Sequence, residues 1–128
     1  MNKINITFNQ FQKGVDRTYY FVGETKREEL LYLALATNAE AGEMADEVKK
    51  MMRDDNGELT PEREEKIKKE MGDTLFYMAI LATKLGFNFS DAANAEIDKL
   101  QQLIRDWENA TGKTFDPETF KHDKRNNK

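Results

Sequence analysis

The clearest structural signal in the sequence is a helix between Thr60 and Gly86, where the letters are TPEREEKIKKEMGDTLFYMAILATKLG. Thr60 is a typical N-cap residue, and Pro61 suits the first helical position because an N–H there would have no helical partner. Gly86 suits the left-handed conformation in which many helices end. Between these signals, apolar residues recur at intervals of three and four, which predicts an amphipathic helix with one buried face. These residues are Ile67, Met71, Leu75, Met78 and Leu81.

Three more helices are expected around this one. Thr7 and Thr25 each begin a capping box, and Ser90 marks a third helix start. The residues from Asp54 to Gly57 are typical of a turn between helices. No alternating apolar pattern is long enough to predict a strand, so the expected fold class is all-α with a four-helix core. The four predicted helices are Phe8–Arg17, Lys26–Arg53, Pro61–Leu85 and Asp91–Ala110.

The length of 128 residues is that of one domain. Charged residues make up 34% of the chain, but eight Phe, four Tyr and one Trp are too many for a disordered protein. Four of the last eight residues are Lys or Arg, which is typical of a frayed basic end. We therefore expect a single all-α domain over residues 1–120 and a flexible basic tail over residues 121–128.

The composition argues against several kinds of chemistry. The absence of cysteine removes disulfides, thiolate zinc sites, Fe–S clusters and cysteine nucleophiles. A single histidine, His122, argues against a Ser-His-Asp triad and against metal sites built from several histidines. A net charge of −4 argues against nucleic-acid binding, and no apolar run suits a membrane span or a signal peptide. We expect a cytoplasmic protein whose chemistry uses carboxylates, lysines, hydroxyls and a hard metal ion.

Two short acidic motifs lie in the second and third predicted helices. Residues 40–43 read Glu-Ala-Gly-Glu, and residues 70–73 read Glu-Met-Gly-Asp. Residues three apart share a helix face, so each motif presents two carboxylates on one side. The short connection favours antiparallel packing of the two helices, which would bring four carboxylates together beside the core. A hard cation such as Mg²⁺ or Mn²⁺ would relieve their repulsion.

Each motif also contains a glycine inside a helix, which costs about 1 kcal/mol relative to alanine. Gly42 and Gly72 therefore predict a close packing neighbour. A simpler interpretation of the acids stays open from spacing alone: surface charges can pair with lysines one turn away. The residues that could take part are Glu43, Glu47 and Lys50 in the second helix, and Lys66 and Glu70 in the third.

The two motifs and their surroundings resemble the MazG-like nucleoside triphosphate pyrophosphohydrolases. The resemblance covers roughly Glu28 to Leu103 and includes Leu33-Ala34-Leu35, Val48-Lys49-Lys50 and the run from Gly72 to Tyr77. It implies a MazG-like helical bundle assembled as a homodimer or homotetramer. It also implies cleavage of nucleoside triphosphates between the α and β phosphates, with Mg²⁺ as cofactor or Mn²⁺ in its place. By this resemblance the catalytic and metal-binding residues are Glu40, Glu43, Glu70 and Asp73, with Glu47 as a candidate further ligand.

Five residues are candidates for contacts with the substrate. Lys50 and Arg53 could hold the β and γ phosphates, and Tyr77 lies one turn beyond the second motif. The family often has an Asn-x-x-Lys-Leu element in its fourth helix. Here Lys99 and the leucine after it are kept, while Asn94 lies near the position where the family has asparagine. For the basic residues the alternative is a solvated side chain, and for Tyr77 it is a buried aromatic.

The sequence therefore predicts a Mg²⁺-dependent nucleoside triphosphate pyrophosphohydrolase that acts on canonical or damaged (deoxy)nucleotides in nucleotide-pool control. Two alternatives stay open. One is a relative with the same fold, such as an all-α dUTPase or a phosphoribosyl-ATP pyrophosphohydrolase. The other is a non-catalytic helical interaction module whose acids bind a metal ion only for assembly.

Overall fold

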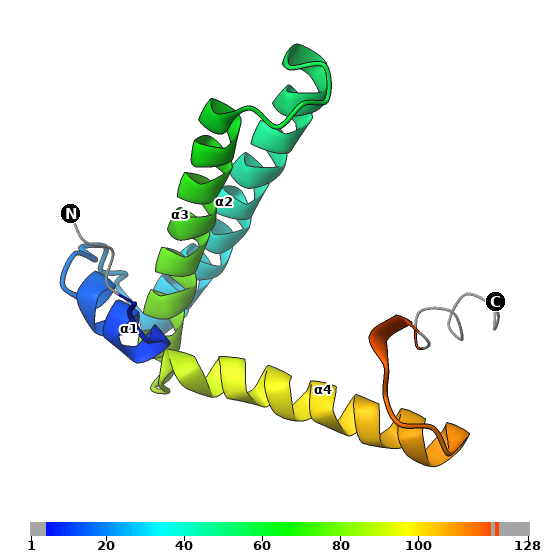
Figure 1. The fold of residues 1–128 in the computed structure, drawn as a ribbon. Coiled ribbons are helices and arrows are strands. Elements are labelled where there is room, and N and C mark those ends of the chain that lie inside the picture. Colours follow the sequence, from blue (N-terminus) through cyan, green and yellow to red (C-terminus); the bar gives the residue numbers. More distant parts are fainter. Residues whose placement is uncertain (1–4, 119, 121–128) are drawn as a thin grey trace. The chain divides into compact units, whose positions relative to one another are not determined.

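The computed structural model describes residues 5–118 and residue 120 (Figure 1). This part of the chain is helical and contains no strand, which confirms the predicted all-α fold class. The predicted helix ends are correct to within two residues. Within the described residues, no helix combines the length and the apolar character that a membrane span requires. The helices are α1 (Phe8–Asp16), α2 (Lys26–Asp54), α3 (Pro61–Leu85) and α4 (Phe89–Thr111).

The chain separates into two compact units, one ending at Ser90 and one beginning at Asp91. The first unit holds α1, α2 and α3, and the second holds nearly all of α4 and the segment after it. A single domain over residues 1–120 stays a prediction. The predicted basic tail, residues 121–128 with His122, lies outside the described residues.

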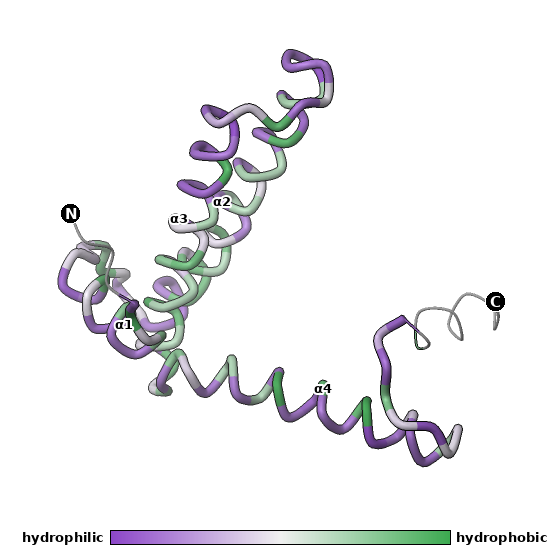
Figure 2. Tube along the Cα trace, in the orientation of Figure 1, coloured by the Kyte–Doolittle hydropathy of each residue, from purple (hydrophilic) through white to green (hydrophobic). Residues whose placement is uncertain are grey.

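Helices α2 and α3 pack side by side as an antiparallel hairpin (Figure 1). The predicted turn between them is present, and Asn56 (φ 55°) and Gly57 (φ 80°) take the left-handed conformation that reverses the chain. Along α3 the residues change from hydrophilic near its start to hydrophobic near its end (Figure 2). The buried apolar side chains accordingly gather at the end of the hairpin away from the turn. They are Leu33, Ala79, Ile80, Ala82 and, just beyond α3, Phe89.

Helix α1 is held against the end of α3 by one buried amide. The Nε2 group of Gln12 donates hydrogen bonds to Thr83 Oγ1 at 3.1 Å and to the Phe87 carbonyl at 3.0 Å. Its Oε1 atom accepts a hydrogen bond from the Phe89 N–H at 2.8 Å. The side chain thus uses its donors and its acceptor to join α1 to the connection between α3 and α4.

The same contacts explain why the predicted start of the last helix is wrong by two residues. Helix α4 begins at Phe89 instead of Asp91. Its first N–H groups need acceptors, and α1 supplies them: Gln12 accepts from Phe89, and Asn9 Oδ1 accepts from the Ser90 N–H at 3.1 Å. The cap therefore comes from a different helix, about 80 residues earlier in the chain.

The second unit has a small aromatic cluster after the end of α4. The ring centroids of Trp107, Phe115 and Phe120 lie 5.4 to 5.9 Å apart. Gly112 (φ 68°) takes the left-handed conformation directly after the end of α4. The carboxylate of Glu108 then accepts a hydrogen bond from the Phe115 N–H at 2.7 Å. Trp107 therefore packs among aromatic side chains of its own unit.

Candidate functional site

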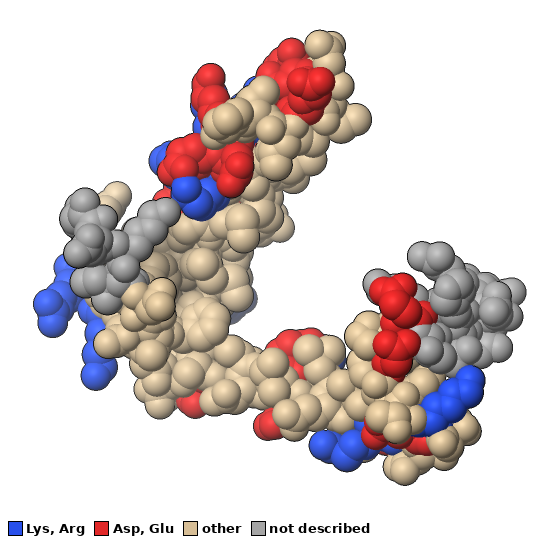
Figure 3. Space-filling model, in the orientation of Figure 1, with Lys and Arg blue, Asp and Glu red and all other residues tan. Residues whose placement is uncertain are grey.

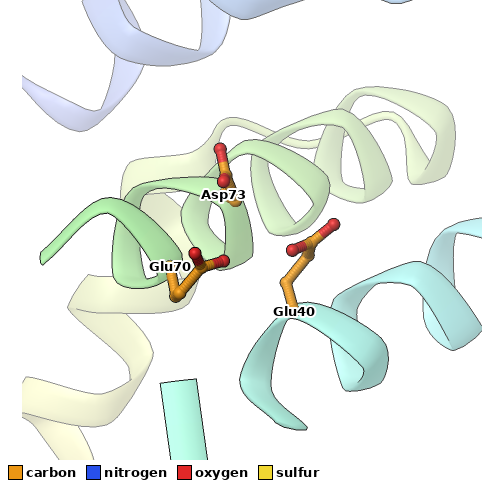
Figure 4. Close-up of side chains that lie close together, drawn as sticks. All are labelled: Glu40, Glu70 and Asp73. Carbon is orange, nitrogen blue, oxygen red and sulfur yellow. The ribbon is translucent and has the colours of Figure 1, made fainter. Parts of the chain in front are cut away.

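The antiparallel hairpin brings the two acidic motifs together. Glu40 projects from α2, and Glu70 and Asp73 project from α3 toward it (Figure 4). One carboxylate oxygen from each of the three lies within 4.8 Å of the others. All three side chains are half-buried. We call these three residues the acid cluster.

Like charges at this distance disturb one another. The pKa of Glu40 is raised, chiefly by burial and then by the charges of Asp73, Glu70 and Glu43. The one cation that opposes this shift in the pKa of Glu40 is Lys69. Its Nζ lies 3.6 Å from Glu70 and 3.9 Å from Asp73, and its side chain is 72% exposed. The acid cluster is therefore only weakly compensated by the chain itself.

The chemistry of these donors fits a hard divalent cation. All three offer carboxylate oxygens, which Mg²⁺ and Mn²⁺ prefer over nitrogen or sulfur. Unlike a histidine or cysteine site, the cluster would not discriminate in favour of zinc. An added cation would favour the charged form of Glu40 and so lower its raised pKa. It would also supply the positive charge that Lys69 supplies only weakly.

Glu43, the remaining acid of the motifs, is placed differently. It lies one turn after Glu40 on α2 and is exposed, and its carboxylate is not part of the acid cluster. Its charge still contributes to the raised pKa of Glu40, so the two carboxyl groups interact. Its role as a fourth ligand stays a prediction.

Glu47 is buried in an ion-pair network instead of lying in the acid cluster. It accepts hydrogen bonds from Arg63 Nη1 at 2.5 Å and from Lys50 Nζ at 2.7 Å. Arg63, also buried, donates in addition to Asp55 Oδ2 at 2.8 Å. Lys50 lies 2.8 Å from Asp46 as well. We call these five residues the paired network. Its ion pairs hold the Glu47 carboxylate within the hairpin.

The basic candidates from the sequence already have carboxylate partners. Lys50 belongs to the paired network, and Arg53 binds Asp54 through two hydrogen bonds of 2.5 and 2.7 Å. Of the lysine pairs considered from spacing, the structure contains the one between Glu47 and Lys50. Lys66 bonds to Glu62, one turn earlier, in the part of the chain that is described. On the visible face of the α2–α3 hairpin, charged side chains gather toward the turn end (Figure 3).

An aromatic hollow lies one turn beyond the acid cluster. Tyr77 contacts Tyr32 and Phe76, with ring centroids 6.4 and 5.2 Å away, and Phe21 stacks on Tyr32 at 4.1 Å. These four residues line the hollow together with the segment from Thr18 to Tyr20. Burial, the hydrogen bond with Tyr32 and the charge of Glu40 raise the pKa of Tyr77 to about 12. Tyr77 is thus both part of an aromatic wall and electrostatically linked to the acid cluster.

The remaining candidates belong to the second unit. Asn94 and Lys99 lie on α4, where both are exposed. Lys99 forms an ion pair with Glu96 at 2.7 Å. Their contacts with substrate stay predictions.

The predicted close neighbours of the motif glycines are not found in the described chain. A Cβ atom added to Gly42 or Gly72 would meet nothing within 4 Å. Both glycines are exposed, and helix spacing alone does not show which faces the chain itself covers, so a close neighbour from outside the described chain stays a prediction. Each glycine therefore leaves an open strip of helix backbone beside an acidic motif.

The sequence reasoning missed Arg63 and Lys69. Arg63 lies in the first turn of α3, where a charged residue is normally solvated, and its partner Glu47 is 16 residues away. Lys69 stands four residues before Asp73, so helix spacing could have identified this contact. The aromatic residues Phe21 and Tyr32 carried no local signal of a shared hollow.

Comparisons with known proteins agree with the position of these motifs. Residues 28–105 match the model of the MazG nucleotide pyrophosphohydrolase domain. Gene 37 protein of Mycobacterium phage L5 is 38% identical over 74 residues, which are 58% of this chain and 65% of the phage protein. The chain thus spans about 65% of that relative's length, and no solved structure matches it. Because the match to the domain covers more than half of the chain and includes both acidic motifs, the chain belongs to the MazG nucleotide pyrophosphohydrolase domain family.

Proposed function

We propose that this protein is a Mg²⁺-dependent nucleoside triphosphate pyrophosphohydrolase. It would cleave between the α and β phosphates and release a nucleoside monophosphate and pyrophosphate. The observation that carries the proposal is the acid cluster, in which two helices bring three carboxylates within 4.8 Å inside the region that matches the family. Half-buried carboxylates that repel one another destabilise the fold unless a cation is bound, so binding is a plausible reason for their placement.

Each acidic residue has a proposed role. Glu40, Glu70 and Asp73 hold the cation, and the exposed Glu43 joins them by a change of side-chain rotamer. Bound Mg²⁺ supplies neutralisation of phosphate charge and lowers the pKa of water. One of the four carboxylates also orients or deprotonates the attacking water. Glu47 has two cationic partners of its own, so we assign it to the paired network.

The aromatic hollow is the proposed place for the nucleoside. Phe76 and Tyr77 lie three and four residues after Asp73 on α3, and Tyr32 and Phe21 complete the wall. Stacking on aromatic rings suits any base, because every base has a π face. Among the predicted phosphate contacts, Lys50 and Arg53 would have to leave their present carboxylates. Asn94 and Lys99 remain candidates from the second unit.

We also propose a homodimer or homotetramer. Leu31 and Leu35 on α2 are 53% and 70% exposed, and Met71 on α3 is 51% exposed. The open strips beside Gly42 and Gly72 would let a second copy approach closely. Exposed apolar area of this kind is commonly covered in an oligomer.

Light scattering at micromolar concentration tests the assembly. We expect the mass of two or four chains for the wild type and a smaller mass for Leu35→Asp. Leu59→Asp is the matched control, because Leu59 is 56% exposed in the turn between the helices and should leave the mass unchanged. A monomer mass for the wild type would contradict the proposal.

Pyrophosphate release with Mg²⁺ across the ribo- and deoxyribonucleoside triphosphates tests the activity. We expect monophosphate and pyrophosphate as products, in keeping with a cytoplasmic role in nucleotide-pool control. Diphosphate and inorganic phosphate as main products would refute the proposed bond cleavage. Turnover of dUTP alone would favour an all-α dUTPase, and turnover of phosphoribosyl-ATP alone would favour that pyrophosphohydrolase. No turnover of any nucleotide would favour a non-catalytic module.

A further inference from the structure

We infer that Lys69 binds the phosphates of the pyrophosphate leaving group, so that the triphosphate extends from the acid cluster along α3 toward its N-terminal end. This inference rests on the proposed function and deepens it. It assigns Lys69 as a substrate-binding residue and gives the direction in which the substrate lies along α3.

The first argument is that Lys69 has weaker carboxylate contacts than the basic candidates on α2 and than the neighbouring lysines on α3. Lys50 and Arg53 have carboxylate partners at 2.8 Å or less. On α3, Lys66 bonds to Glu62 at 2.7 Å and Lys68 bonds to Glu65. Lys69 has no hydrogen bond within the described residues, and its two carboxylate contacts are 3.6 and 3.9 Å long.

The second argument concerns the identity of those two contacts. Both Glu70 and Asp73 are proposed metal ligands, so their charge is shared with a cation when the site is loaded. Lys69 then loses most of its attraction to them. Its flexible side chain is 72% exposed, so the ammonium group can turn toward another anion. A phosphate group bound beside the cation is such an anion.

The third argument is the order of side chains along α3. Residues 66, 69, 73 and 77 recur at intervals of three and four, so they share one face. Along this face the order is aromatic hollow, acid cluster and then the two lysines. A nucleoside triphosphate has the matching order of base, α-phosphate and terminal phosphates. Beyond the cluster, Lys66 and Lys69 line an open surface depression together with Glu62 and Glu65.

The direction of the substrate follows from this order. The base would lie toward Tyr77, and the β and γ phosphates would lie toward Lys69 and Lys66. Each helical turn advances about 5.4 Å, so Lys69 is only one turn from Asp73. A phosphate beside the cluster is therefore within reach of a lysine side chain.

The test is calorimetric titration of inorganic pyrophosphate with Mg²⁺ into the wild type, Lys69→Met and Lys68→Met. The two variants change the charge equally and lie next to each other on α3, but Lys68 bonds to Glu65 instead of contacting the acid cluster. We expect Lys69→Met to weaken pyrophosphate binding about tenfold, as loss of a charge-assisted phosphate contact should. Lys68→Met should stay within about twofold of the wild type, as exposed surface pairs do.

A second titration with Mg²⁺ alone separates phosphate binding from support of the metal site. Lys69→Met should bind Mg²⁺ at least as tightly as the wild type, because a competing cation has been removed. Weaker Mg²⁺ binding, or equal loss of pyrophosphate binding in both variants, would overturn the inference. If the wild type hydrolyses nucleotides but Lys69→Met binds pyrophosphate normally, the inference fails and the proposed function stands. If the wild type neither binds pyrophosphate nor hydrolyses nucleotides, the proposed function fails with it.

Discussion

Two groups of carboxylates lie on the same hairpin and differ in what neutralises them. In the paired network, Glu47 of α2 meets Arg63 of α3. In the acid cluster, seven residues earlier on α2 and seven residues later on α3, Glu40 meets Glu70. Seven residues are two helical turns, so the two contacts occupy equivalent positions of the antiparallel pair. One site holds opposite charges and the other holds like charges.

The difference shows how the same residue type can serve two purposes on one scaffold. Where α3 supplies an arginine, the glutamate is buried, fully paired and part of the structure. Where α3 supplies Glu70 and Asp73, the charge of Glu40 is only weakly compensated, and burial together with the neighbouring charges raises its pKa. A partly buried carboxylate is stabilised by a cation, and at the acid cluster we propose that this cation comes from outside the chain. Each of the following changes either removes this contrast or makes it clearer.

The largest expected effect is on turnover when the acid cluster loses a ligand. Asp73→Asn should reduce turnover on the order of 100-fold or more, because it weakens charge stabilisation of the transition state. Its melting temperature should not fall, since the variant removes a repulsion. Steady-state pyrophosphate release measures the turnover, and thermal melts measure the melting temperature. Glu64→Gln, an exposed acid on the same helix, is the control and should keep wild-type turnover.

Breaking the paired network should affect stability instead. Arg63→Met leaves the buried Glu47 without its main partner, and we expect the melting temperature to fall by more than about 5 °C. Arg53→Met removes an exposed ion pair and should lower it by no more than about 1 to 2 °C. Differential scanning calorimetry of both variants measures the two shifts in melting temperature. Equal shifts would mean that the paired network is no more important than a surface ion pair.

Neutralising one acid of the acid cluster should raise the melting temperature, whereas breaking the paired network should lower it. Glu70→Gln should melt a few degrees above the wild type in EDTA, because one of the converging charges is gone. With Mg²⁺ the wild type should gain more, since ligand binding adds about 2.7 kcal/mol at a hundredfold excess over Kd. The two melting curves should therefore change order when metal is added. Curves that stay parallel in both conditions would remove the case for a metal site.

The smallest expected effect is the acid response of the paired network. Hydrogen bonds from Lys50 and Arg63 lower the pKa of Glu47 from its ordinary value near 4.5. A carboxyl group with a lowered folded-state pKa stabilises the fold above its ordinary pKa, and this contribution is lost as pH falls through the folded-state value. Urea melts from neutral pH down to about pH 3 should show a smaller loss of unfolding free energy for Glu47→Gln than for the wild type. Identical losses would place the acid response elsewhere in the chain.

Local signals made most of the fold predictable. The capping boxes at Thr7 and Thr25 are formed by residues three apart, and both are present in the structure. The convergence of Glu40 with Glu70 followed from helix spacing and a short turn. The start of α4 was wrong because its first N–H groups bond to α1, and such a partner leaves no local pattern.

The candidate site was predictable only in part, for the same physical reason. Which residues of α2 and α3 face each other depends on the register of the hairpin, and spacing within one helix does not give it. The pairing of Glu47 with Arg63 could not be read from either helix alone, whereas the pair of Glu47 with Lys50 follows from spacing within α2. The described chain places no close neighbour at Gly42 or Gly72, because a single sequence does not show which helix faces the chain itself covers.

The amide of Gln12 has a consequence for the order in which the chain folds. Its partners Thr83, Phe87 and Phe89 lie 71 to 77 residues later in the sequence. A helix of nine residues such as α1 is marginal in water on its own. During synthesis α1 is made before α2 and α3, yet Gln12 has none of these partners until residues 83–89 have been made, while most of α2 and α3 can already pair across their short turn. We therefore expect pulse-labelling hydrogen exchange to find the amides of α1 protected after those of the hairpin, so that the first helix to be made is the last of the three to fold.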